Sequence, residues 1–192
     1  MSEKLDLTPL PHYLRAKEYV LAQGYAEEIE WQKNVKFENM TAGDLFLEYC
    51  WVVISSGMKN QVARLINERF HDGFPNWKAI GHLGKRKGMQ ELWRTFPTHF
   101  DKLKQLTSDE ARVNYLETLP WIGGITKYHL AKNLGMDVAK PDRHLIRVAA
   151  WYGYNDVQDL CIHLSQATGD RISVVDLIIW RYCNLKGSFK TI

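Results

Sequence analysis

The stretch LPWIGGITKYHLAKNLG, residues 119–135, constrains the fold more than any other part of this sequence. A helical pattern precedes it, and Thr126–Leu134 has the spacing of a second helix. Between the two, Pro120 and the pair Gly123-Gly124 predict a tight turn, in which the glycines allow positive φ and a close approach of another backbone. The segment therefore predicts a helical hairpin at about residues 109–134.

Helical patterns continue along the rest of the chain. An apolar run from Leu45 to Ile54 behind a possible cap at Thr41 predicts a central buried helix. Ile172–Val175 could form a strand, but apolar residues continue beyond it without a turn signal, so we expect a helix there. No repeat, low-complexity tract or linker interrupts the pattern. We therefore expect an all-α fold of roughly ten helices in one domain, residues 1–192.

Two helix boundaries are predicted from short signals. Thr107 with Glu110 three residues later has the form of a capping box for the first helix of the hairpin. Pro97 is expected to close a helix over GMQELWRTF, because proline breaks the hydrogen-bond ladder of a helix interior. Gly135 is a natural C-terminal stop for the second helix of the hairpin.

Composition excludes several classes of protein. The 192 residues are 45% hydrophobic, enough for a substantial core, yet no apolar run approaches the ~18 residues of a membrane span. The N-terminus lacks the apolar region of a signal peptide. The three cysteines are far apart and read as free thiols of a reducing compartment. We expect a soluble intracellular monomer in the cytoplasm, or in the host cytoplasm if the source is viral, with no membrane partner.

Charge alone does not indicate a partner, because the net charge is only +3. Local clusters of cations are more informative. Such clusters could follow the phosphates of a nucleic acid or form an ordinary solvated surface, and the sequence leaves both readings open. The clustered cations are Lys85, Arg86 and Lys87, and then Lys127, Lys132, Lys140, Arg143 and Arg147.

The turn of the hairpin has the features of a phosphate site. The helix that follows it directs free backbone N–H groups out of the turn, where a phosphate oxygen would be well placed. A grip on the DNA backbone that ignores sequence needs this and little else. An ordinary helical hairpin with a glycine turn is the alternative. The residues expected to contact DNA are Pro120, Gly123, Gly124, Thr126 and Lys127.

Asp142 follows the hairpin by about twenty residues, in the step KPDRHL. An aspartate in this position can simply cap the helix that begins after it, a contribution of ~1 kcal/mol. Its occurrence behind a Pro- and Gly-containing hairpin suggests a second reading, in which the carboxylate is catalytic.

These two motifs together resemble the helix-hairpin-helix, Gly/Pro-Asp superfamily of DNA glycosylases, which includes endonuclease III and the adenine glycosylase of mismatch repair. Leu119–Gly123 matches the LPGVG-type hairpin, and Pro141–His144 with Arg147-Val148 matches the segment of the family aspartate. Val53–Ser56 falls where the family has an LLSAQ helix end, and Trp180–Cys183 is similar to its hGRxxC helix. The resemblance covers most of the chain from about residue 41.

The resemblance implies two helical lobes with a cleft between them. The hairpin would hold the backbone of double-stranded DNA, and a target base would be flipped into the cleft. Asp142 would face the sugar of the flipped nucleotide, stabilise an oxocarbenium-like transition state and help a water to attack. The implied activity is base removal by a DNA glycosylase, as in base excision repair.

Three departures from the family pattern narrow this expectation. Ile125 stands where bifunctional members place the lysine that forms a Schiff base, and Lys127 lies about 200° further round the helix, so we expect a monofunctional enzyme. Cys183 matches the first cysteine of the iron–sulfur members, but no cysteine follows it, and a cluster needs four thiolates. Lys140-Pro141 directly precedes Asp142, which places a cation beside the carboxylate.

The last departure, Lys140-Pro141 before Asp142, also allows a second function as an alternative to the glycosylase. A bacteriophage branch of this superfamily is thought to join an amine or amino acid, such as glycine, to a phosphorylated 5-hydroxymethyl-pyrimidine in DNA. In such an amino acid:DNA transferase, Lys140, Arg143 and His129 could form a pocket for the leaving phosphate, and Asp142 could act as the base. A non-catalytic DNA-binding relative is the third reading.

We expect no bound metal at this site and no cofactor. His129 and His163 have no cysteine or carboxylate at ligand spacing, so the sequence does not predict a zinc site. The family precedent allows a monovalent cation held by backbone carbonyls of the hairpin.

Overall fold

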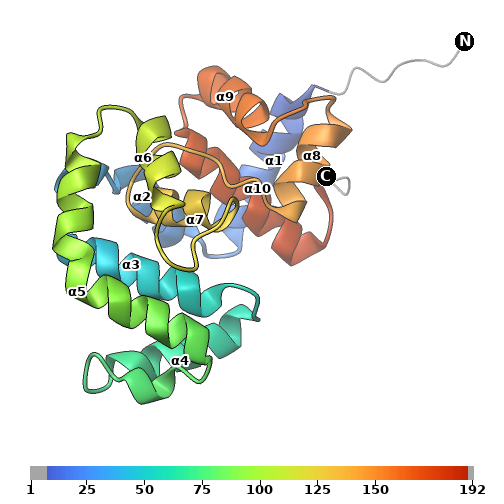
Figure 1. Cartoon of the computed structure of the whole chain (residues 1–192). Helices are drawn as coiled ribbons and strands as arrows, with labels where there is room; N and C mark the ends of the chain where they lie inside the picture. Colours follow the sequence, from blue (N-terminus) through green and yellow to red (C-terminus); the bar gives the residue numbers. More distant parts are fainter. Residues whose placement is uncertain (1–7, 190–192) are drawn as a thin grey trace, which may run out of the picture. The chain divides into compact units, whose positions relative to one another are not determined.

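A computed structural model of the chain describes residues 8–189, and this part of the protein contains helices and no strands (Figure 1). The helices group into two compact units, one formed by residues up to 35 together with those from 137 onward, and the other by Lys36–Met136. The all-α prediction is confirmed. No helix in the described part is long and apolar enough to cross a membrane.

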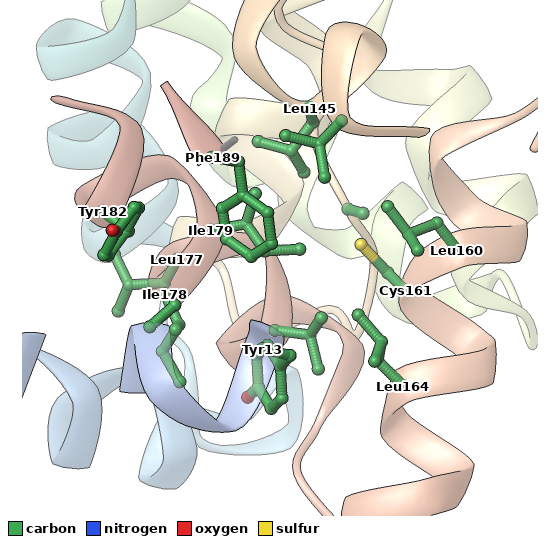
Figure 2. Packing of buried hydrophobic residues seen from close by; sticks show 14 of the residues in the cluster. Tyr13, Leu145, Leu160, Cys161, Leu164, Leu177, Ile178, Ile179, Tyr182 and Phe189 are labelled. Atoms are coloured by element: carbon green, nitrogen blue, oxygen red, sulfur yellow. The ribbon is translucent and has the colours of Figure 1, made fainter. Parts of the chain in front are cut away.

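The first unit is built around its last helix. Its elements are α1 (Pro9–Ala22), α2 (Ala26–Asn34), α8 (Arg143–Trp151), α9 (Val157–Thr168) and α10 (Ile172–Lys186). The side chains of α10 are buried from Ser173 to Ile179, because α1, α2, α8 and α9 all pack against it. Figure 2 shows the resulting core, in which Ile178 and Ile179 of α10 lie among side chains such as Tyr13, Leu145 and Leu164.

The sequence run Ile172–Val175, which could have been a strand, forms the first turn of α10. Burial on almost every side explains its β-branched composition. A helix that neighbours surround can be apolar all round, so it loses the alternation that separates helices from strands on a half-exposed surface.

The second unit is built around α3. Its elements are α3 (Ala42–Ser55), α4 (Asn60–His71), α5 (Leu83–Gln105), α6 (Asp109–Leu116) and α7 (Thr126–Asn133), with short 3₁₀ turns at Phe37–Asn39 and Trp77–Ala79. The predicted cap at Thr41 is confirmed: its hydroxyl accepts from the Asp44 N–H, and the Asp44 carboxylate accepts from the Thr41 N–H. Helices α4, α5 and α7 pack on α3, which Figure 1 shows lying alongside α5.

The predicted capping box of α6 is wrong by one residue. Ser108, not Thr107, is the N-cap, and its Oγ accepts from the Ala111 N–H at 3.2 Å. Thr107 and Ser108 are both good caps, and sequence spacing to Glu110 selected the wrong one of two adjacent hydroxyls.

The predicted helix end at Pro97 is also wrong, because α5 continues through it to Gln105. Figure 1 shows α5 bending part-way along its length, as a helix does where a proline removes a hydrogen bond. Pro97 is exposed, so water can satisfy the carbonyl that loses its partner. The buried residues of one face (Met89, Leu92, Phe100 and Leu103) keep helical spacing across the proline, and this packing holds the helix together.

Candidate nucleic-acid interface and carboxylate site

The hairpin of the second unit consists of α6, a nine-residue turn and α7, as the sequence predicts. Two contacts hold it against α3. The buried Tyr49 hydroxyl donates to the Pro120 carbonyl at 2.8 Å, and the Asn133 amide donates to the Glu48 carboxylate at 2.8 Å. Burial raises the pKa of Glu48, and the bond from Asn133 opposes that shift. The turn is thus mounted on the most buried helix of its unit.

The backbone of the turn differs from the expectation. Neither Gly123 nor Gly124 has positive φ; Trp121 does, with φ 64°. Such a conformation costs an L-residue about 1–2 kcal/mol. The indole is held on α5, because a Cβ added at Gly84 would lie 2.5 Å from it and one at Gly88 would lie 2.6 Å from it. Packing of this one side chain therefore places the left-handed residue two positions before the glycines.

The space beside the Cα atoms of Gly123 and Gly124 is open to solvent and is not filled by other parts of the protein. A Cβ added at Gly123 would meet no atom within 4 Å, and one at Gly124 would make only an ordinary contact of 3.7 Å with the Glu117 carboxylate. Both residues are exposed. No packing or backbone requirement within the described residues therefore demands glycine here, and close approach of an external group remains a physical reason for it.

The start of α7 offers unpaired donors beside these glycines. The N–H groups of Gly124, Ile125 and Thr126 donate to no other residue of the part that the structure describes. The Gly123 N–H, which was also expected to be free, donates to the Thr126 hydroxyl at 2.7 Å. Three successive outward N–H groups at the positive end of a helix dipole form a suitable site for one anionic oxygen.

The predicted cationic cluster around the hairpin is only partly available. Lys127 forms an ion pair with Glu117 at 2.6 Å, and its side chain is only 13% exposed. Lys132 is buried. Lys85 is buried too, and its ammonium donates to the Ser56 carbonyl at 2.7 Å, near the end of α3; burial lowers its pKa. Of the two interpretations that the sequence left open, phosphate contact and a solvated surface, neither describes these three lysines: Lys85 and Lys127 bind groups of the protein, and Lys132 is buried.

Asp142 belongs to the first unit and is the N-cap of α8, as the sequence predicts. Its Oδ1 accepts from the backbone N–H of His144 at 2.9 Å and of Leu145 at 3.2 Å. Among the described residues, nothing donates to its Oδ2. The half-buried carboxylate is therefore oriented through one oxygen, while the other oxygen keeps its lone pairs for an external group.

The segment that leads to Asp142 is fixed by contacts that the sequence does not reveal. Asp137 accepts from the backbone N–H and hydroxyl of Ser173 at 2.9 and 3.0 Å. Ala139 exchanges two hydrogen bonds with the Gln158 side chain, and the Lys140 N–H donates to the buried Asp176 of α10. An irregular segment is thereby held on α9 and α10, which sets the position of the α8 N-terminus.

The charge of Asp142 affects the pKa of two neighbouring groups, Cys183 and His144. Burial raises the pKa of the Cys183 thiol to about 11, and the negative charge of Asp142 adds to this shift, so the thiol lies within electrostatic reach of the carboxylate. Burial lowers the pKa of His144, and Asp142 opposes that shift. The thiol is inert at neutral pH, and no nucleophilic function follows from it.

The other predicted pocket residues fall on different elements. Lys140 and Arg143 flank Asp142 in the first unit, where Lys140 is half-buried and Arg143 exposed. His129 lies on α7 in the second unit. Whether the three form one pocket stays a prediction.

No described group of three or more His, Cys, Asp or Glu residues could hold a metal ion. A monovalent cation at the hairpin would have to use backbone carbonyls. Those of Leu119, Pro120 and Gly123 already accept hydrogen bonds from the protein, whereas those of Trp121 and Ile122 accept none from described residues. The donor set fits a cation in part, and the cation remains a prediction.

Comparison of the whole chain with known proteins identifies the fold. The crystal structure of the Methanocaldococcus jannaschii 8-oxoguanine glycosylase/lyase, in complex with a 15mer DNA containing 8-oxoguanine, superposes with a TM-score of 0.71. The match is 18% identical and covers 90% of this chain and 97% of that one. The 8-oxoguanine DNA glycosylase of Thermotoga maritima gives a TM-score of 0.70 at 18% identity, over 94% of this chain and 97% of that one.

This chain has the DNA glycosylase fold. The resemblance read from the hairpin and Asp142 is thereby confirmed at the level of the fold. No family model matches the sequence, and no curated protein does. Only 18% of the aligned residues are identical to those of the Methanocaldococcus jannaschii enzyme. The likeness is therefore one of topology and burial pattern, and few individual side chains are shared.

Proposed function

We propose that this protein binds double-stranded DNA and removes a flipped base as a monofunctional DNA glycosylase. The observation that supports this most directly is Asp142 within the glycosylase fold. Its Oδ1 is held by two backbone N–H groups at the start of α8, and its Oδ2 is left for substrate. That both solved relatives are described as 8-oxoguanine glycosylases, one of them bound to DNA, adds support.

The proposed reaction is hydrolysis of the N-glycosidic bond. As the bond between C1′ and the base nitrogen lengthens, its electron pair leaves with the base and positive charge develops on the sugar. The Asp142 carboxylate offsets that charge and accepts a proton from the attacking water, whose oxygen bonds to C1′. The released base takes up a proton. Asp142 can serve both steps because the cap orients one oxygen and leaves the other unpaired.

Ile125 supports the monofunctional assignment. It lies at the start of α7 and is 51% exposed, in the place where the family pattern of bifunctional members has its amine nucleophile. An isoleucine cannot form a Schiff base with the sugar, and Lys127 is paired with Glu117. We expect base release to leave an intact abasic strand, with no covalent adduct trapped by borohydride.

The transferase alternative is supported by the cations that flank Asp142. Lys140 and Arg143 stand on either side of the carboxylate, suited to a leaving phosphate, in the step Lys-Pro-Asp-Arg. Mass spectrometry of oligomers incubated with the protein separates the two reactions. Duplexes with 8-oxoguanine or other damaged bases should lose a base if the glycosylase proposal is right. Duplexes with 5-phosphomethyl-uracil and added glycine should exchange phosphate for glycine if the transferase proposal is right, and they should become slightly lighter, because the phosphate that leaves is heavier than the glycine that replaces it.

We also propose that the protein holds no iron–sulfur cluster. Cys50, Cys161 and Cys183 are buried and form no disulfide among the described residues, and the first lies in a different unit from the other two. Four cysteine ligands are required for the common clusters, and the sequence has three cysteines. Purified protein should show no absorption near ~400 nm. Stoichiometric iron and sulfide in the purified protein would contradict this prediction.

A further inference from the structure

Trp121 is the residue of the hairpin that sequence reasoning overlooked. In the family pattern its position is a glycine, and in the structure it is the non-glycine residue with positive φ among residues 8–189. Trp121 as a residue is 48% exposed, although its side chain is one of the largest apolar groups of the unit. A glycine at this position would adopt the same backbone without strain, so the turn by itself gives no reason for tryptophan.

The indole packs against two glycines of α5. Gly84 and Gly88 are four residues apart and therefore on one face of the helix, and any side chain at either would collide with the ring. The His82 ring meets the indole edge-on, with centroids 5.0 Å apart. A ring seated on glycines on one side and half-exposed on the other is a fixed aromatic platform.

The platform lies in the same turn as the unpaired donors of α7. Trp121 is three residues from Gly124, and three residues of chain span at most ~11 Å. The first N–H of the proposed phosphate site and the exposed indole are therefore close enough to contact neighbouring nucleotides of one strand. Bases stack on aromatic side chains whatever their identity, provided that they are not already stacked within a duplex.

We propose that Trp121 is a DNA contact, on which an unstacked base next to the hairpin-bound phosphate stacks. This inference rests on the proposed binding of DNA and adds a specific preference. DNA in which a base is unpaired should bind more tightly than a continuous duplex, because only a free base can lie against the ring. Trp121 thereby favours DNA that is already opened at one position.

Fluorescence anisotropy with two labelled duplexes tests this preference, one fully paired and one with a single bulged base. Trp121→Ala should weaken binding to the bulged duplex about fivefold to a hundredfold, and binding to the paired duplex much less. Trp121→Phe, which keeps an aromatic ring, should lose less. Trp31→Ala is the matched control, because Trp31 is also 48% exposed but lies beside Glu27 and Glu30, which would repel phosphates.

Gly84→Ala tests the platform without altering the contact residue. Alanine favours a helix, so α5 should form normally while the added methyl displaces the indole. We expect weaker binding to the bulged duplex, in the same direction as Trp121→Ala. Wild-type affinity of Trp121→Ala or Gly84→Ala for the bulged duplex would overturn this inference and leave the proposed function standing. Failure of the wild type to bind either duplex would overturn both.

Discussion

Replacing Asp142 with asparagine is expected to slow base release about 10²–10³-fold while the protein remains folded and bound to DNA. Asparagine has the shape of aspartate and is an equally good N-cap, so its amide oxygen can still accept from the His144 and Leu145 N–H groups. What it loses is the negative charge that offsets the charge developing on the sugar. Because the same negative charge also repels the phosphates of DNA, its loss should leave DNA binding unchanged or improved.

Asp156→Asn is the matched control for this substitution. Asp156 caps α9 through the Gln158 N–H as Asp142 caps α8, yet it has no place in the proposed site. Both variants should unfold at nearly the same denaturant concentration as the wild type, and only Asp142→Asn should lose activity. Full activity of Asp142→Asn on damaged-base and 5-phosphomethyl-uracil oligomers would exclude both proposed mechanisms.

The same pair of oligomer sets decides between the two reactions. Abasic sites that appear only with damaged bases, and only with the wild type, support the glycosylase. A product in which glycine has replaced the phosphate, formed only from 5-phosphomethyl-uracil with glycine, and no abasic product anywhere, would replace the glycosylase with the transferase. Asp142→Asn should abolish that exchange as well, because the incoming amine would lose its base.

Replacing both Gly123 and Gly124 with valine is expected to weaken duplex binding about tenfold to a hundredfold. This is the effect of losing one or two charge-assisted hydrogen bonds to phosphate. The fold should survive, because neither glycine has positive φ and neither added Cβ would collide with the protein. The new side chains would instead occupy the exposed space before the free N–H groups of α7. Affinity measured over a range of salt concentrations should also show a shallower salt dependence.

Gly43→Val is the control for these substitutions. Gly43 is exposed in the first turn of α3 and has ordinary φ, and an added Cβ would make only an ordinary contact of 3.5 Å with the Thr41 hydroxyl, so it matches the hairpin glycines in exposure, in the sign of φ and in room for a Cβ. It should bind DNA as the wild type does. Unchanged affinity of the double hairpin variant at all salt concentrations would remove the hairpin from the interface.

The sequence by itself determined the class of fold and the positions of its two informative motifs. Local signals sufficed for these: the apolar run of α3, the Pro- and Gly-containing turn after α6, and a carboxylate one residue before α8. Each depends on residues within a few positions of one another, and such interactions are visible in a sequence.

Tertiary packing decided what local signals could not. Proline breaks the hydrogen-bond ladder of an isolated helix, but buried residues on both sides of Pro97, among them Phe100 against Phe37, carry α5 past it. The sequence alone cannot distinguish Lys85, Lys127 and Lys132 from solvated cations. In the structure Lys132 is buried, and Lys85 and Lys127 are bound by Ser56 and Glu117, which lie ten or more residues away in the chain. The Lys85 ammonium, for example, binds the Ser56 carbonyl because the end of α3 folds against it.

The left-handed residue of the hairpin was decided in the same way. Glycine has the lowest intrinsic cost of positive φ, so a sequence places that conformation at Gly123 or Gly124. The structure places it at Trp121, whose indole packs on Gly84 and Gly88 of α5. Gly84 and Gly88 lie more than thirty residues earlier in the chain, so only the folded protein brings the indole into contact with them.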